Sequence, residues 1–569
     1  MYIAIVPNRS SPPAILLREG YRDDGKVKNR TLANLSSLSM PQVEAIRAVL
    51  RGDALAPVEE MFEISASAHH GHIQAVRSAM GHLGFDRLIA SRPSRERDLV
   101  CAMVAARIVA PHTKLATTRW WQTSTLADDM GVSNASEDDL YAAMDWLLER
   151  QGAIEQKLAK RHLTPGSLVL YDLTSSYFEG TTCPLARLGH NRDGKKNKLQ
   201  VNYGLITDRR GCPVAVSVFA GNTADSATLS GQVKKLRQEF GVAKLVLVGD
   251  RGMISQRSID EELSEIDGLA WITALRSERI RALVEGGGLQ LGLFDERNLF
   301  ELAHDDYPGE RLIACRNAEL KKLRAHKRES LLEATVKELD KVRAMVVRGT
   351  LRGRDKIGVR VGKVINKYKV AKHFTLAIED DRFAFARREE QIAAEAALDG
   401  IYVIRTSLPA EQMSADDTVR SYKALSNVER AFRSLKTIDL KVRPIHHRLA
   451  ERVRSHIFLC MLAYYVEWHM REAWRPLLFA DEDQEAKRTR DPVAPAKRSA
   501  RALEKVATRK LSDGTPAHSF RTLLEHLATI VRNTCRTPGA PASTSTFQIV
   551  TTPSPSQRRA LELIDTIRL

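Results

Sequence analysis

Between residues 167 and 276, short apolar runs alternate with helical segments, and this alternation limits the possible folds of the chain more than any other feature. Apolar residues at helical spacing occupy residues 225–240 and 256–266, and residues 207–211 predict the turn of a hairpin. The order of three strands, a helix, a strand, a helix and a strand predicts an α/β fold with a mixed sheet covered by helices. The predicted strands are residues 167–172, 200–206, 213–219, 244–250 and 269–275.

Two of these apolar runs end on an aspartate. Asp172 closes the run 167–172, and Asp250 closes the run 244–250. Ligands collect at the carboxyl ends of strands in open α/β sheets, so both carboxylates are candidates for one binding site. Either aspartate by itself is explained equally well as a turn or helix-cap residue, and it is their pairing that favours a site.

A third carboxylate, Glu429, lies in a predicted helix over residues 422–436. At helical spacing Tyr422, Glu429, Arg433 and Lys436 fall within about 60° of arc, and the apolar residues fall on a neighbouring face. A structural stripe of ion pairs would give the same spacing, so the helix by itself leaves both interpretations open.

Asp172, Asp250 and Glu429 together form a set of hard oxygen ligands, which Mg²⁺ prefers. A pair of such ions a few Å apart can stabilise both the attacking and the leaving oxygen of a phosphoryl transfer. The three carboxylates therefore predict a two-metal phosphoryl-transfer site.

The charge of the chain indicates a polyanionic partner. Lys and Arg number 87 against 70 Asp and Glu, which gives a net charge of +17. DNA is the commonest such partner, and a merely basic protein is the alternative. The apolar fraction of 43% excludes global disorder.

A predicted basic loop precedes the second strand of the sheet. Close to the candidate site this loop would follow DNA phosphates, and elsewhere it would be a solvated surface loop. Its basic residues are His190, Arg192, Lys195, Lys196 and Lys198.

The six cysteines are scattered without a Cys-x-x-Cys pair, which argues against a zinc ribbon and fits a reducing cytoplasm. His69, His70 and His72 lack the spacing of a helical metal site, so no zinc is expected there. The longest apolar run, residues 457–466, is too short to span a bilayer, and the N-terminus lacks the apolar core of a signal peptide. We therefore expect a soluble cytoplasmic protein without a membrane partner.

Four blocks of the sequence resemble those of bacterial insertion-sequence transposases of the DDE type, in the group with a Tyr-Arg-Glu-Lys signature. The signature Y-x2-R-x3-E-x6-K matches Tyr422, Glu429 and Lys436 at the right spacing, and Leu425 replaces the arginine. The segments around the two aspartates, residues 171–180 and 248–253, and the segment 189–201 are also similar to this group.

The resemblance implies a ribonuclease-H-like core with a β-rich insertion between Asp250 and Glu429. It also implies that Asp172, Asp250 and Glu429 bind two Mg²⁺ or Mn²⁺ ions, and that water and then a DNA 3′-hydroxyl attack phosphodiesters. Tyr422 and Lys436 would hold DNA phosphates near the cleaved end, and Arg433 is a candidate substitute for the missing arginine. The expected partners are the terminal inverted repeats of the element, target DNA and a second copy of the chain, on the bacterial nucleoid.

Six segments follow from this organisation. We expect a small β-containing unit (1–62), a helical domain that binds DNA ends (63–164), two parts of the catalytic core (165–279 and 400–478), an insertion (280–399) and a C-terminal linker and tail (479–569), for which assembly is a candidate role. The finer predictions are strands at 2–6 and 14–17, a helix at 40–50, helices throughout 65–162, a long charged helix at 317–345, and β-like stretches at 358–365, 373–378 and 382–385.

Two other functions remain open at this point. A DNA-binding protein descended from a transposase is one, although the intact carboxylate set argues against it. A nuclease that only hydrolyses DNA is the other, because hydrolysis and strand transfer use the same kind of site.

Overall fold

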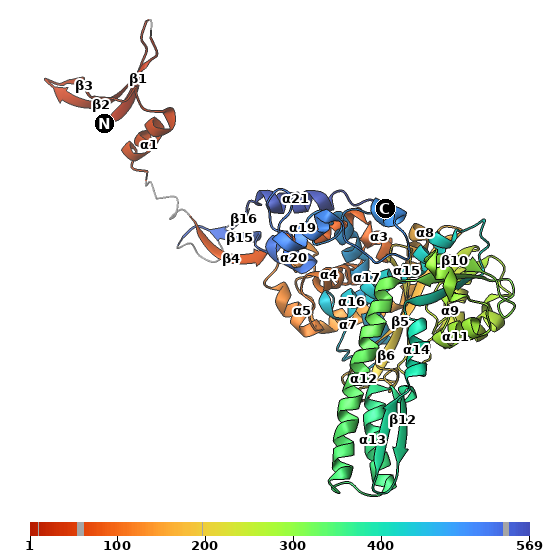
Figure 1. The fold of residues 1–569 in the computed structure, drawn as a ribbon. Coiled ribbons are helices and arrows are strands. Elements are labelled where there is room, and N and C mark those ends of the chain that lie inside the picture. The colour runs from red at the N-terminus through yellow and green to blue at the C-terminus, as the bar shows by residue number, and fades with distance from the viewer. Residues whose placement is uncertain (10, 54–61, 196, 539–545) are drawn as a thin grey trace. The chain divides into compact units, whose positions relative to one another are not determined.

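The computed structural model describes the chain except residues 10, 54–61, 196 and 539–545 (Figure 1). Contacts divide the chain into two units. The first comprises Met1–His69 and Ile530–Thr552, and the second His70–Thr529 and Pro553–Leu569.

The described residues of the first unit form two small antiparallel sheets and one helix. Strands β1 (Tyr2–Val6), β2 (Ala14–Asp23) and β3 (Lys26–Asn34) form one sheet, and β4 (Glu63–His69), β15 (Val531–Arg536) and β16 (Phe547–Val550) form the other. Helix α1 (Met40–Leu50) begins at a capping box of Ser39 and Gln42, as predicted for residues 40–50. The prediction missed β3 because this strand is polar and exposed throughout. The helix predicted from residue 65 is wrong at its start, where β4 is a strand.

An eight-stranded mixed sheet forms the centre of the second unit, which confirms the predicted fold class. Its strand order is β10-β11-β14-β9-β8-β5-β6-β7, and only β5, β8 and β9 pair in parallel. The strands are β5 (Ser167–Tyr177), β6 (Gln200–Thr207), β7 (Pro213–Ala220), β8 (Leu245–Val248), β9 (Leu269–Ala274), β10 (Leu299–Leu302), β11 (Arg311–Arg316) and β14 (Ile401–Thr406).

The helices predicted between the strands of the sheet are present. Each begins as an α-helix and ends in a π-helical turn. The first consists of α9 (Leu229–Lys234) followed by the π-helical turn Lys235–Glu239. The second consists of α10 (Gln256–Ser258) followed by the π-helical turn Ile259–Leu263. Helix α11 (Ser277–Glu285) then leads away from the last parallel strand.

A layer of helices packs around one long central helix, α17 (Ala450–Ala473), which contacts α2, α4, α7 and strand β7. Its residues from Ser455 to Met470 are all buried, as expected of a helix that is apolar on every side. The surrounding helices are α2 (Gly71–His82), α3 (Phe85–Ile89), α4 (Arg95–Val109), α5 (Lys114–Trp121), α6 (Leu126–Asp129), α7 (Glu137–Glu149) and α8 (Gln151–His162).

Within the described part of the chain, no single helix has the length and apolar character needed to cross a bilayer. The bent pair α4 and α5 passes that test only when its two helices are taken together.

The insertion contains more helix than strand, so the predicted β-rich insertion is wrong. The long charged helix is confirmed as α12 (Ala318–Val347), which begins at the side-chain cap of Asn317. Residues 358–365, predicted as β-like, lie in α13 (Arg354–Tyr368), where Ile357, Val361, Val364 and Ile365 form a helical apolar stripe. The other elements are β12 (Phe374–Ile378), β13 (Phe383–Arg387) and α14 (Glu389–Ala397).

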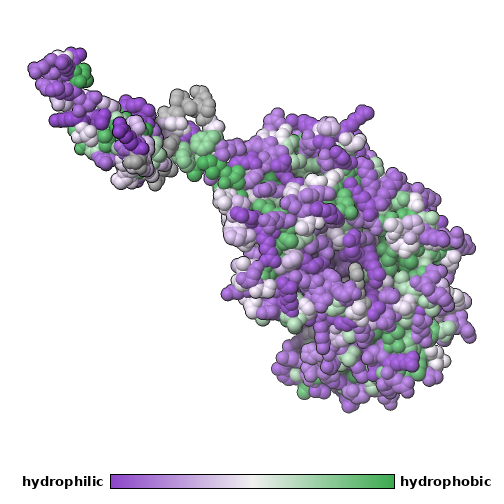
Figure 2. Space-filling model, turned by 90° about the horizontal axis from the view of Figure 1, so that it is seen from above, coloured by the Kyte–Doolittle hydropathy of each residue, from purple (hydrophilic) through white to green (hydrophobic). Residues whose placement is uncertain are grey.

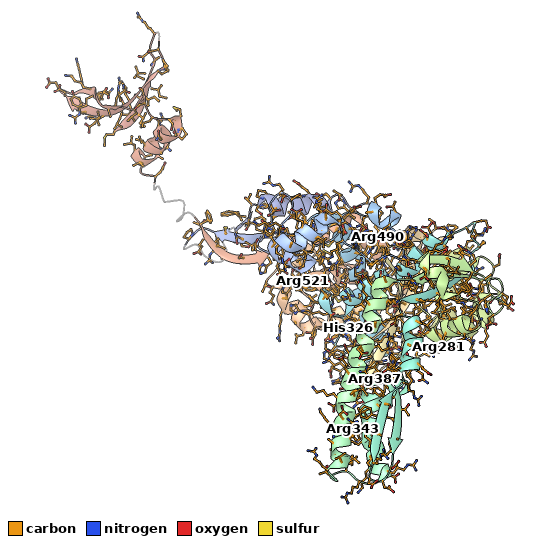
Figure 3. The ribbon with its side chains drawn as sticks, in the orientation of Figure 1. Arg281, His326, Arg343, Arg387, Arg490 and Arg521 are labelled. Carbon is orange, nitrogen blue, oxygen red and sulfur yellow. The ribbon has the colours of Figure 1, made fainter. Side chains whose placement is uncertain are left out.

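Helices α12 and α13 pack against the β12–β13 hairpin around a separate apolar core that includes Leu339, Val361 and Phe374 (Figure 1). Arg343 and Arg387 lie on this module (Figure 3), where Arg343 stacks over Phe385 and Arg387 pairs with Glu329 at 2.8 Å.

The module leaves and rejoins the sheet at one place. Strands β11 and β14 are neighbours in the sheet, and the Asn317 N–H, just after β11, donates to the carbonyl of Gly400, just before β14. At the same place Arg328 of α12 forms a bidentate ion pair with the buried Asp399, at 3.0 and 2.6 Å.

The C-terminal region is more structured than the predicted linker and tail. Its helices are α18 (Glu485–Thr489), α19 (Ala500–Thr508), α20 (Phe520–Ala528) and α21 (Pro555–Ile564).

The visible face in Figure 2 is mainly hydrophilic, with small apolar areas. The six-segment division of the chain and the assembly role of residues 479–569 stay predictions.

Trp474, just after α17, is fully buried, and its indole N–H donates to the carbonyl of Ala560 in α21 at 2.8 Å. We expect Trp474→Ala to lower the free energy of unfolding by about 3–5 kcal/mol, because the change leaves a large cavity. Thermal unfolding followed by circular dichroism measures this loss. The control is Trp120→Ala at a half-buried position, and equal shifts of the midpoint in both variants would contradict the prediction.

Candidate metal and DNA site

The pairing of β5 with β8 places Asp172 beside Asp250. Every pair in this parallel ladder is offset by 78 residues, from Ser167 with Leu245 to Leu170 with Val248, and the aspartates share the offset (250 − 172 = 78). Each aspartate follows the last pair by two residues and therefore lies on the same face as that pair. The register thus brings both carboxylates to one place on the sheet.

Asp172 does not end its strand, contrary to the prediction. Strand β5 continues to Tyr177, and Asp172 pairs with Leu205 of β6 near its middle. The strand continues because β6 still pairs with it after β8 has ended at Val248. Asp172 therefore lies just beyond the point where β5 stops pairing with β8. The loop that follows β8 carries Asp250, so the two aspartates lie near each other.

Backbone hydrogen bonds orient both aspartates. Asp172 Oδ1 accepts from its neighbour's N–H at Leu173, at 2.8 Å. Asp250 Oδ1 accepts from the N–H groups of Gly252 and Met253, at 3.0 and 2.9 Å. One oxygen of each carboxylate is thus held by the backbone, which fixes the direction of the other.

Glu429 lies on α16 (Leu425–Arg433), a short helix that packs against β5. Val428, Ala431 and Phe432 form its buried face, and the ring of Phe432 meets that of Tyr203 edge-on at 5.9 Å. Glu429 itself is exposed. The predicted apolar stripe is confirmed, and it anchors the helix from which Glu429 projects.

The charges of the three carboxylates act on one another. Burial, together with the smaller effect of the negative charges of Asp250 and Glu429, raises the pKa of Asp172 to about 7, although the Leu173 N–H and the charge of Arg192 act in the opposite direction. Tyr422 belongs to the same group, because burial and then Asp250 raise its pKa to about 12, with smaller contributions from Asp172 and Glu429. Three acidic groups that repel one another in a half-buried site suit a divalent cation.

The predicted continuous helix 422–436 is wrong. The chain forms α15 (Ala415–Lys423), then α16, and then a π-helical turn, Ser434–Ile438. A π-helical turn holds more residues than an α-helical one, so it rotates Lys436 away from the face that carries Glu429. Arg433, the last residue of α16, is exposed.

Lys436 is buried and paired with Asp193, a residue that the sequence did not single out. Asp193 Oδ1 accepts from Lys436 Nζ at 2.9 Å and from the guanidinium of Arg443, while its Oδ2 accepts from the Tyr177 N–H at 2.9 Å. Although burial opposes it, the hydrogen bonds from Lys436 and Arg443 hold the pKa of Asp193 below its ordinary value. The only feature of the sequence that could have indicated this role of Asp193 is its position as the one aspartate among the five basic residues of the loop.

The basic loop lies beside the site, and most of its cations have partners. Arg192 pairs with Asp225, Lys198 pairs with Glu179 at 2.9 Å, and Lys195 lies 5.9 Å from the ring centre of Tyr177. Of these, Arg192 is close enough to lower the pKa of Asp172. His190 is exposed, and Lys196 lies outside the described residues.

The Asp193 cluster gives a stability prediction. Asp193→Ala leaves the buried Lys436 and the half-buried Arg443 without a counter-charge, so we expect a loss of about 3–5 kcal/mol in the free energy of unfolding. Glu179→Ala removes the partner of a more exposed lysine and should cost less than about 1 kcal/mol. Thermal unfolding of both variants tests this. A loss with Asp193→Ala as small as that with Glu179→Ala would show that the Asp193 cluster does not stabilise the protein.

Comparisons with known proteins agree with this geometry. Residues 164–466, more than half of the chain, match the family model described as the transposase DDE domain. Residues 3–57 match the model of the N-terminal domain of the IS1634 family of transposases. No protein of curated function matches the sequence.

Two solved structures are distantly similar. A piggyBac transposase in a synaptic complex with hairpin DNA shares 11% identity, with 80% of this chain and 76% of that chain covered and a TM-score of 0.33. A Mos1 transposase in a paired-end complex with the left transposon end also shares 11%, with 34% and 62% covered and a TM-score of 0.14.

The family model spans both aspartates and Glu429, and proteins with this domain use divalent metal ions and act on DNA. This chain belongs to the insertion-sequence transposases of the DDE type.

Proposed function

We propose that this transposase uses Asp172, Asp250 and Glu429 to bind two Mg²⁺ or Mn²⁺ ions, cuts DNA at the ends of its mobile element and joins those ends to target DNA. The main support is the parallel register of β5 and β8, which aligns the two aspartates beneath the helix that carries Glu429. Burial and, to a smaller extent, repulsion from Asp250 and Glu429 raise the pKa of Asp172, and a cation in this site would offset both effects.

When bound, the ions would polarise the attacked phosphate and stabilise the attacking and leaving oxygens. The chain itself contributes position and charge. Backbone N–H groups fix one oxygen each of Asp172 and Asp250, so both carboxylates are oriented in advance. The phenol of Tyr422 stays protonated at neutral pH and can donate a hydrogen bond to a DNA phosphate.

We assign the basic residues around the site to two roles. Arg433 and His190 are exposed and are proposed to contact DNA directly, together with the remaining lysines of the basic loop. Lys436 is held by Asp193, so its ammonium reaches a phosphate only if that ion pair opens. In the closed arrangement Lys436 instead positions the loop that carries Arg192.

The first experiment uses purified protein, DNA with the element's own ends, and Mg²⁺ or Mn²⁺. Wild type should cleave at the element boundary, and Asp250→Asn should reduce cleavage by at least about 100-fold while end binding is kept, because the metal site loses a charged ligand. Asp381→Asn, an exposed aspartate between β12 and β13, is the matched control and should cleave normally.

The outcomes separate the alternatives. End binding without cleavage by either protein, in both metals, would favour a non-catalytic DNA-binding protein. Cleavage without joining of the 3′ end to a second duplex would favour a purely hydrolytic nuclease.

We propose the terminal inverted repeats and target DNA as partners, bound by a homodimer on the bacterial nucleoid. The net charge of +17 supports DNA, a polyanion, as the partner. A dimer would hold two ends together. Light scattering of the protein with end DNA should give a mass of two chains and two ends. A complex with the mass of one chain and one end at all concentrations would overturn the dimer.

The pKa of Asp172 predicts how metal binding depends on pH. Below about pH 7 the carboxyl is largely protonated in the metal-free protein, so binding must displace a proton; above about pH 7 it is already ionised. We expect metal affinity to rise from pH 6 to pH 8, with proton release at pH 6. Calorimetry in buffers of different ionisation enthalpy measures both effects. Asp172→Asn should abolish the proton release, and pH-independent affinity in wild type would contradict this.

A further inference from the structure

Two histidines and a cysteine from distant parts of the chain meet behind the sheet. His162 ends α8, Cys212 precedes β7, and His469 lies on α17. Cys212 Sγ lies 4.0 Å from Nε2 of His162 and 3.9 Å from Nε2 of His469. The three ligand atoms all lie within 4.8 Å of one another.

The protonation of the two imidazoles suits a metal. Burial lowers the pKa of His162 to about 4 and that of His469 to about 3, so both rings are neutral at physiological pH and each has a nitrogen lone pair. Burial raises the pKa of the Cys212 thiol, so a metal would have to displace its proton. Asp208 and Glu472 bring negative charge to the cluster, and Arg161 and Arg210 bring positive charge.

A cavity of about 340 Å³ gives access to the cluster. His162, His469 and Glu472 line it, together with Trp468 of α17. A water molecule from this cavity can complete a coordination shell of four.

We propose that His162 Nε2, Cys212 Sγ and His469 Nε2 bind one Zn²⁺ ion, with water as the fourth ligand. Zinc bonds of about 2.1 Å to nitrogen and about 2.3 Å to sulfur place the two kinds of ligand atom about 3.5 Å apart in a tetrahedral site. The observed sulfur–nitrogen distances of 3.9 and 4.0 Å require a small contraction, and the two imidazole nitrogens, which lie within 4.8 Å of each other, have to approach as well. His162 Nε2 would give up its contact with the hydroxyl of Tyr465, at 3.1 Å.

Such an ion would brace the helix that carries Glu429. Cys212 ends the turn between β6 and β7, and Asn427 of α16 donates to the carbonyl of Arg209 in that turn at 3.0 Å. The turn lies so close that a Cβ on Gly211 would come within 2.8 Å of Asn427 Cβ. Fixing Cys212 to α8 and α17 therefore fixes the surface on which α16 rests. The zinc site is separate from the three carboxylates and does not depend on their proposed role.

Cobalt titration of the full-length, metal-stripped protein tests the site. One equivalent of Co²⁺ should give a thiolate-to-cobalt charge-transfer band and intense tetrahedral d–d bands, and Zn²⁺ should remove both. An oxygen-only site gives neither, so the bands distinguish this cluster from the carboxylates, and they should persist in Asp250→Asn.

Cys212→Ser should lose the bands, and Zn²⁺ should no longer raise its melting temperature. Cys460→Ser is the matched control, because Cys460 is equally buried but has a single histidine, His456, within 4.0 Å of its sulfur. It should keep both responses. Absence of the thiolate band in wild type would overturn the proposal, and this result does not depend on whether Cys212→Ser folds. An unchanged band in Cys212→Ser would overturn it as well.

Discussion

A slip of one residue between β5 and β8 would place Asp172 and Asp250 on opposite faces of the sheet, so the candidate site depends on their register. Burial on both faces holds that register. Val169, Leu170, Leu247 and Val248 are fully buried, and a slipped strand would have to exchange each of these contacts for another. The core of the sheet thus determines the position of the carboxylates before any ligand is present.

The third carboxylate depends on a different kind of contact. Glu429 is exposed, and its position is set by the neighbouring face of α16, where Val428 and Phe432 pack on the sheet. Support from the β6–β7 turn adds a second surface behind the same helix. A rigid platform matters here because a metal site of the kind proposed tolerates little displacement of its ligands.

The sequence predicted those parts of the fold in which local pattern and tertiary packing agree. The apolar runs before Asp172 and Asp250 gave the parallel strands, and the stripe around Val428 gave the anchoring helix. The prediction placed the end of β5 too early because the true end depends on pairing with β6. Such pairing is a property of the whole sheet and not of the local sequence.

Other errors have equally specific causes. The π-helical turn that moves Lys436 to Asp193 has no local signature, since each of its residues also fits an α-helix. In α13 the β-branched residues Val361, Val364 and Ile365 favoured a strand by composition, although their spacing is helical. The cluster of His162, Cys212 and His469 joins residues up to 307 positions apart (469 − 162 = 307), so no motif could reveal it.

The hydrogen bond between Asn317 and Gly400 joins the two ends of the module formed by α12, α13, β12, β13 and α14. The chain leaves β11 and returns to the adjacent β14 through one narrow neck, closed by the Arg328–Asp399 pair, and the module has its own apolar core. Related chains can therefore lengthen, shorten or exchange this module without changing the order of the strands.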